Sequence, residues 1–316
     1  RGACQGGCAK PAEPIEPGRF SGSNPIGPNT MKHDPPPSIP ARRSALGVAL
    51  LAGLGPSAWA QVKTGENPEA SPIWQKVRAN LFQSRPITAA AADMLSLDAP
   101  VRADDAAVVP IAIRTRAPQT GGKRIDKVYL VIDNNPSPIS AIFQFTPLAG
   151  RADIETRVRI DEYTHVRAIA ETSDGQLLMA TRFLKAAGGC SAPPGKDAQA
   201  ALATLGRMKF RVETDPAADP KGDRPVLAQL MISHPNNSGL AMDQVSRLFT
   251  PAHFVRQLRV TYGGELVMSA DVDFSISENP NFRFYFLPKG GGELKAEVID
   301  SNDLKFETAL SYRRPD

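Results

Sequence analysis

Apolar and polar residues alternate with a period of two in short runs along most of the chain after residue 106. Runs of this kind, rich in Val, Ile, Phe and Thr, are typical of half-buried β-strands. The pattern predicts strands at Ala107–Arg114, Lys127–Asp133, Ala141–Thr146, Ile154–Ile160, Val166–Thr172 and Leu177–Leu184, and then at Met208–Glu213, Val226–Ser233, Val255–Tyr262, Glu265–Ala270, Phe282–Leu287, Leu294–Ile299 and Leu304–Leu310. Turn signals rather than helices separate the runs, which indicates antiparallel β-sandwiches.

Two short helices are predicted at the borders of these strand series. Ser71-Pro72, a cap followed by a first-turn proline, precedes apolar residues at helical spacing, so we expect a helix to open the fold. Asp197–Leu205 has a short Ala/Leu helix pattern. The strand series therefore predict two sandwich domains, residues 61–187 and 207–316, joined by a Gly/Pro linker over residues 188–206.

The region before residue 61 has the parts of an export signal. Arg42-Arg43 precede the apolar block Ala45–Leu54, which is followed by the small-residue site Ala58-Trp59-Ala60. Such an order is typical of a secretory signal peptide, so we expect residues 31–60 to direct export to the periplasm, with a twin-arginine route left open. Residues 1–30 are interpreted as a disordered upstream extension. The block is shorter than the roughly 20 residues of a membrane helix, so no membrane span is expected.

Charge excludes one class of partner once this signal is set aside. The whole chain has 37 Lys+Arg against 33 Asp+Glu, whereas residues 61–316 retain 31 and 30. Without a basic cluster or an aromatic-basic stripe, no nucleic-acid partner is expected. The same residues contain only Cys190 of the three cysteines, so they cannot form an internal disulfide.

Cys190 is the candidate for covalent chemistry. Gly188 and Gly189 precede it and small residues follow, so we expect an accessible thiol outside any strand. The thiolate is the reactive form of cysteine, and Lys185 and Lys196 favour it modestly if they fold back toward the sulfur. The alternative is a buried, inert cysteine, which is the commoner environment of a lone cysteine.

The remaining chemistry-bearing residues form no catalytic pattern in the sequence. The histidines after the signal are His165, His234 and His253, and the last two are 19 positions apart without metal-ligand spacing. We therefore expect no metal site and no catalytic residues. No phosphate-binding glycine loop or dinucleotide fingerprint is present, so no cofactor is expected beyond a cargo bound covalently to Cys190. A Cys-His hydrolase stays open, because its residues meet in space rather than in sequence.

Six segments carry a resemblance to a known family. Four of them resemble the Y subunit of the bacterial sulfur-oxidation carrier: Lys127–Pro136, Arg157-Val158-Arg159, Val166–Thr172 and Gly188-Gly189-Cys190. Ser233–Gly239 and Ser277–Phe284 are similar to its Z subunit. In this order and in one polypeptide, the two halves resemble the fused SoxYZ-like carriers associated with quinoprotein dehydrogenases. The resemblance implies an all-β fold of two immunoglobulin-like antiparallel β-sandwich domains in tandem, SoxY-like and then SoxZ-like.

The resemblance also implies a site. In the family, the Y cysteine lies on a glycine-rich C-terminal arm that presents sulfur-oxidation intermediates to successive enzymes. Carried over to this sequence, Cys190 is the attachment site, and Gly188 and Gly189 form its arm. Two features depart from the family. Ser191 and Ala192 replace the two glycines that follow the cysteine, and the arm is not a free end because the chain continues.

The resulting hypothesis is a non-enzymatic periplasmic carrier. It holds a sulfur intermediate, a persulfide or thiosulfonate, on Cys190 and presents it to periplasmic redox enzymes, among them a quinoprotein dehydrogenase or a c-type cytochrome. The two domains are expected to pack together. The alternative is a non-covalent adaptor for such a dehydrogenase or its cytochrome, in which replacement of the cysteine is silent.

Overall fold

The computed structural model describes residues 67–117, 119, 122–193, 198–213, 224–243 and 246–313. The predicted upstream extension and signal peptide lie outside these residues and stay predictions. No helix in the described part of the chain is long and apolar enough to cross a membrane.

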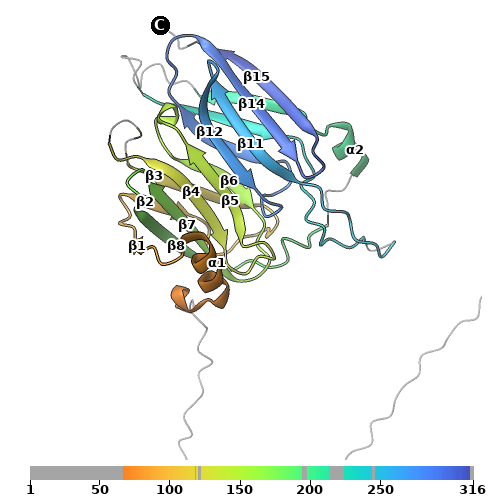
Figure 1. Ribbon diagram of the computed structural model, residues 1–316. Helices are drawn as coiled ribbons and strands as arrows, with labels where there is room; N and C mark the ends of the chain where they lie inside the picture. The colour runs from red at the N-terminus through yellow and green to blue at the C-terminus, as the bar shows by residue number, and fades with distance from the viewer. Residues whose placement is uncertain are drawn as a thin grey trace, which may run out of the picture. The chain divides into compact units, whose positions relative to one another are not determined.

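β-Strands make up most of the described fold (Figure 1). The strands are β1 (Ile87–Ala89), β2 (Leu95–Asp98), β3 (Val109–Thr115), β4 (Ile125–Ile132), β5 (Ile139–Phe145), β6 (Ile154–Val158), β7 (Thr164–Thr172), β8 (Leu177–Leu184), β9 (Met208–Glu213), β10 (Val226–Ile232), β11 (Val255–Tyr262), β12 (Glu265–Val272), β13 (Asn281–Phe286), β14 (Gly292–Asp300) and β15 (Lys305–Tyr312). The helices are η1 (Pro68–Ala70), α1 (Pro72–Phe82), η2 (Pro147–Ala149) and α2 (Ala198–Ala203).

The predicted all-β fold with a short N-terminal helix is confirmed. Every predicted strand is present, with ends that differ by at most two residues, and both predicted helices form. Two further strands, β1 and β2, were not predicted. β1 pairs with β8 in parallel, so pairing is not antiparallel throughout as expected. With three and four residues, these strands are too short for a period-two pattern to be distinctive.

The strands form two sheets, and each sheet runs through both halves of the sequence. The nine-stranded sheet has the order β1-β8-β7-β4-β5-β12-β11-β14-β15, and the six-stranded sheet has the order β2-β3-β6-β13-β10-β9. The halves join by antiparallel pairing of β5 with β12 and of β6 with β13. The two tandem sandwiches therefore pair edge to edge, which covers strand edges that would otherwise be exposed.

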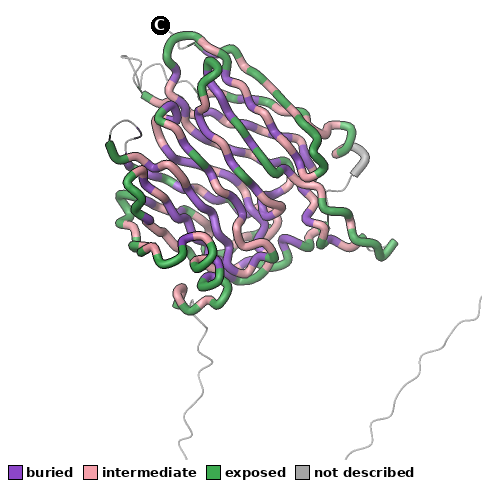
Figure 2. Tube along the Cα trace, viewed as in Figure 1, coloured by how far each residue is buried: buried purple, intermediate pink, exposed green. Residues whose placement is uncertain are grey.

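A single main core lies between the sheets and includes residues from both halves. Its positions follow the alternation of the strands: Phe282, Phe284 and Phe286 of β13 are fully buried, while the residues between them are partly exposed. Figure 2 shows buried positions recurring along the strands in this way. Full burial of one such side chain contributes about 2 to 3 kcal/mol, so this core fixes the register of each sheet.

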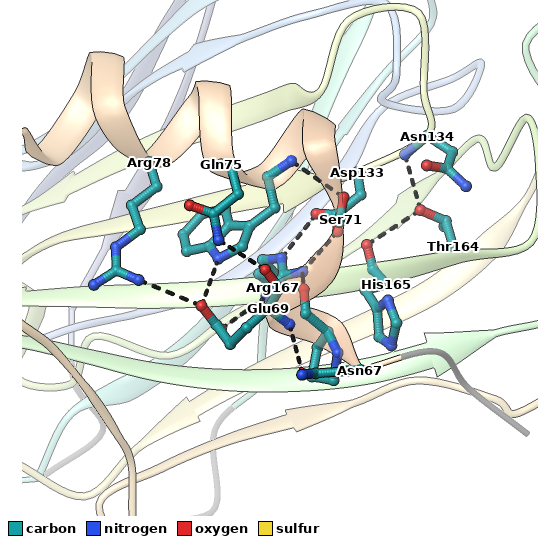
Figure 3. A network of polar contacts seen from close by, with 12 residues as sticks. Asn67, Glu69, Ser71, Gln75, Arg78, Asp133, Asn134, Thr164, His165 and Arg167 are labelled. Atoms are coloured by element: carbon teal, nitrogen blue, oxygen red, sulfur yellow. Dashed lines mark hydrogen bonds and ion pairs between the residues drawn. The ribbon is translucent and has the colours of Figure 1, made fainter.

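Helix α1 is held against the nine-stranded sheet by a polar network around Arg167. The side chain of Ser71 accepts a hydrogen bond from Trp74 N and caps the helix, as the sequence predicted. Trp74 is fully buried, and the guanidinium of Arg167 lies 4.4 Å from the centre of its ring system. Figure 3 shows this guanidinium between Asp133 and Glu69. Nε and Nη2 of Arg167 donate to the two oxygens of Asp133 at 2.8 and 2.7 Å.

Candidate functional site

The arm, Gly188 and Gly189, lies against the first half of the chain. Gly188 N donates to Asp161 O and Gly189 N donates to Ile160 O, each at 2.8 Å. Gly189 has no room for a side chain, because a Cβ would lie 2.1 Å from Ala106 O and 2.7 Å from Ile160 O. Only glycine fits at this position, and the reason is a close approach of two backbone segments.

The Cys190 thiol is buried, with 0% of the residue exposed. The expectation of an accessible thiol is therefore wrong for this conformation. The sequence around the cysteine shows only that small residues flank it, whereas the burial depends on a segment of the second half. Ser238, 48 positions further along the chain, donates a hydrogen bond from its hydroxyl to Cys190 O.

Burial also changes the acidity of the thiol. Desolvation raises the pKa of Cys190 to about 12, and the nearby charge of Asp161 adds to the increase. The charge of Arg159 opposes it. At neutral pH the sulfur is therefore a protonated, weakly nucleophilic thiol, and covalent chemistry requires the arm to move. The cation that acts on the sulfur is Arg159 rather than the predicted Lys185, and Lys196 lies outside the described residues.

Arg159, which lies in a segment of the family resemblance but was not predicted to act at the site, follows β6 and is 4% exposed. Its Nη1 donates to Gly189 O at 3.4 Å, and its Nη2 donates to Asn236 O at 3.3 Å. Both hydrogen bonds are long, and Nε is buried without a partner. Arg159 thus links the arm to the segment after β10.

His234, His253 and Asp300 form a second polar cluster, although no sequence pattern indicated that the two histidines meet. His253 Nε2 lies 2.7 Å and His234 Nε2 3.5 Å from the same oxygen, Oδ2 of Asp300. The histidines come together because the chain after β10 folds back and pairs Asn237 with His253. The prediction that these histidines assemble no constellation is wrong. His165 lies on β7 and is not part of the cluster.

Within this cluster, His253 Nε2 is hydrogen-bonded to Asp300, whereas His234 Nε2 is buried without a hydrogen-bond partner among the described residues. His234 Nδ1 accepts a hydrogen bond from Asn236 N, so the ring proton of neutral His234 lies on Nε2, which faces Asp300. Oδ1 of Asp300 accepts from Asn302 N and Leu304 N. The three side chains are close enough to share a metal ion. Binding one through His234 Nε2 requires the proton to move to Nδ1 and the bond from Asn236 to break.

Family models identify both halves. Residues 78–190 match the sulfur oxidation protein SoxY, and residues 213–311 match the sulphur oxidation protein SoxZ. The chain belongs to the SoxY and SoxZ families, joined in one polypeptide. The SoxY match ends at Cys190, the residue that the arm carries, and the His234 cluster lies in the SoxZ half. The predicted resemblance to a fused SoxYZ-like carrier is therefore confirmed, whereas the association with quinoprotein dehydrogenases stays a prediction.

Solved structures that match part of the chain include two kinds of protein. The sulfur carrier protein SoxY from Chlorobium limicola f thiosulfatophilum is 24% identical, with 36% of this chain and 94% of that chain covered and a TM-score of 0.31. A superoxide reductase (neelaredoxin) from Ignicoccus hospitalis is 14% identical, with 29% and 78% covered and a TM-score of 0.27. These likenesses concern the fold alone. No curated protein matches the sequence.

His234→Asn is expected to make the SoxYZ fold less sensitive to acid. Burial, and then the charge of His253, lower the pKa of His234 from 6.5 to about 4. Between these values the unfolded state binds a proton that the folded state does not, so wild-type stability falls as the pH falls. Asp300, whose pKa is lowered, titrates below this window. From pH 7.5 to pH 5 the histidine accounts for a loss of at most about 2 kcal/mol.

The measurement is urea unfolding at these two pH values. Asparagine keeps an acceptor near the position of Nδ1, so the bond from Asn236 N is retained in the variant. His165→Asn, on β7, is the matched control and should keep the wild-type difference. If His234→Asn also keeps that difference, other groups carry the acid sensitivity.

Proposed function

We propose that this protein is a periplasmic, non-enzymatic sulfur carrier that holds a covalent intermediate on Cys190 and presents it to partner enzymes. The observation that carries the proposal is the position of Cys190. It ends the SoxY match, follows two glycines and lies where the SoxY and SoxZ halves meet. The buried thiol then corresponds to a closed state, and the arm opens to expose the sulfur for loading and unloading.

The chemistry of loading indicates the class of partner. Joining a thiolate to thiosulfate, RS⁻ + S₂O₃²⁻ → RS–S–SO₃⁻ + 2e⁻, forms one S–S bond and releases two electrons. These two electrons need an acceptor, and we infer that a docked partner supplies it. A periplasmic quinoprotein dehydrogenase or a c-type cytochrome is a partner of this class. Export through residues 31–60 would place the carrier in the same compartment.

The proposal predicts a modified cysteine in protein purified from the periplasm. We expect an intact mass that exceeds the thiol form by the mass of a sulfur, sulfite or thiosulfate group and that returns to the thiol form on reduction. Peptide mapping should place the increment on Cys190. Cys190→Ser is the control: it should lose the increment and the function and remain folded, because the hydroxyl is close in size to the thiol.

One observation favours the alternative function, a non-covalent adaptor for a quinoprotein dehydrogenase or its cytochrome. The Cys190 thiol is fully buried, as an inert structural cysteine would be. An unmodified Cys190 that also resists alkylation in the folded protein would overturn the carrier proposal. Co-purification with a dehydrogenase that survives Cys190→Ser would then identify the adaptor.

A further inference from the structure

Arg159 is a buried positive charge that forms no ion pair among the described residues, although the charges of Glu278 and Asp105 act on it from further away. Arg167, another deeply buried arginine, forms a bidentate ion pair with Asp133. Arg159 has no ion pair with any carboxylate of the described residues, and its two hydrogen bonds to carbonyl oxygens are 3.3 and 3.4 Å long. Its Nε has no partner. Because buried charges in proteins are normally paired, this guanidinium has unused capacity to bind an anion.

The unused capacity lies beside the arm. Nη1 of Arg159 contacts Gly189 O, one residue before the cysteine. The other charges that act on the sulfur are negative and come from Asp161 and Asp273. Asp273 has one buried carboxylate oxygen, Oδ1, without a partner. Among the described residues, an anionic group on Cys190 would therefore meet two repulsive charges and one attractive charge, that of Arg159.

We propose that Arg159 is the counter-charge for an oxyanion-terminated group attached to Cys190. This inference rests on the proposed carrier function and assigns the carrier a residue that recognises its cargo. A guanidinium presents five N–H donors in a planar fork, which matches the oxygens of a sulfonate. Hydrogen bonds between such charged groups are about twice as strong as neutral ones. Arg159 then selects what the carrier holds.

Two thiol reagents distinguish recognition of an anionic group from accessibility of the Cys190 thiol. Tetrathionate gives an anionic adduct, RS⁻ + S₄O₆²⁻ → RS–S–SO₃⁻ + S₂O₃²⁻. Methyl methanethiosulfonate gives a neutral adduct, RS⁻ + CH₃SO₂SCH₃ → RS–SCH₃ + CH₃SO₂⁻. In each reaction the thiolate attacks a divalent sulfur and one S–S bond replaces another. Both reagents need an open arm and a thiolate, so the ratio of their rates on Cys190 isolates recognition of the anion.

The experiment measures both rates on the full chain, by mass of the Cys190 peptide, in the wild type and in Arg159→Gln. We expect Arg159→Gln to lower the rate of the reaction with tetrathionate roughly 10- to 100-fold more than the rate of the reaction with the neutral reagent. Arg157→Gln removes the same charge from β6 and is the matched control, with an unchanged ratio expected. Arg159→Lys keeps the positive charge and should restore part of the wild-type ratio of the two rates. It becomes the test variant if Arg159→Gln does not fold.

A second readout is the thermal midpoint of the loaded proteins. In the wild type and in Arg157→Gln, the anionic adduct should stabilise the fold relative to the methyl adduct, and in Arg159→Gln this order should disappear. The inference is overturned if Cys190 loads with both reagents and the ratio is the same in Arg159→Gln as in Arg157→Gln. Failure of the carrier function looks different: Cys190 then loads with neither reagent in the folded protein.

Discussion

Gly189→Ala is expected to expose the Cys190 thiol without disrupting the two sheets. The alanine Cβ would fall 2.1 Å from Ala106 O and 2.7 Å from Ile160 O, and both are backbone atoms that cannot rotate away. The arm must leave its position and lose the hydrogen bond from Gly189 N. Release returns the thiol pKa from about 12 toward its ordinary value, so alkylation near neutral pH should accelerate on the order of 100- to 1000-fold.

The measurement is iodoacetamide labelling of the folded protein, followed on the Cys190 peptide, with urea unfolding in parallel. Gly188→Ala is the control. A Cβ at Gly188 meets nothing within 4 Å, although φ is +81°. It should therefore cost about 1 kcal/mol of backbone strain with only a small change in labelling. Equal labelling of Gly189→Ala and wild type would show that the close approach does not hold the arm closed.

The strands were predictable because their signal is local. The buried Val109, Ile111 and Ile113 of β3 alternate with less buried residues within one run, and the same holds for β13. The cap at Ser71 is also a local signal, and it correctly placed the start of α1. The pairing of edge strands between the two halves could not be predicted from the sequence. A strand that pairs with β12 and a strand whose edge faces solvent can have the same alternation of apolar and polar residues.

The environment of the thiol was not predictable for a different reason. Two glycines before Cys190 indicated a free arm, yet one of them is there because the backbone of Ala106 and Ile160 leaves no space. Charges that act on the sulfur come from Arg159, 31 positions before it, and from Asp273, 83 positions after it. Such contacts depend on how the two halves pair, which no local pattern encodes. The meeting of the two histidines depends on the same tertiary folding.

Arg167→Met is expected to destabilise the fold by about 3 to 5 kcal/mol. The substitution leaves the carboxylate of Asp133, which is 1% exposed, buried without its ion pair. It also removes the hydrogen bond from Nη2 to Pro68 O and the stacking on Trp74 that hold the first turn of the N-terminal helix. Urea unfolding at pH 7 measures the change. Arg85→Met is the control: its pair with Glu171 is partly exposed, so a loss of at most about 1 kcal/mol is expected.

The double variant Arg167→Met/Asp133→Asn tests the physical cause. If the cost comes mainly from the orphaned carboxylate, replacing it by a neutral amide should recover roughly half of the lost stability. If the cost comes mainly from lost packing against Trp74, the double variant should be no more stable than Arg167→Met alone. The first outcome is expected because a buried, unpaired charge costs more than one lost ring contact. The same reasoning applies to Arg159, a buried charge that forms no ion pair with the described residues.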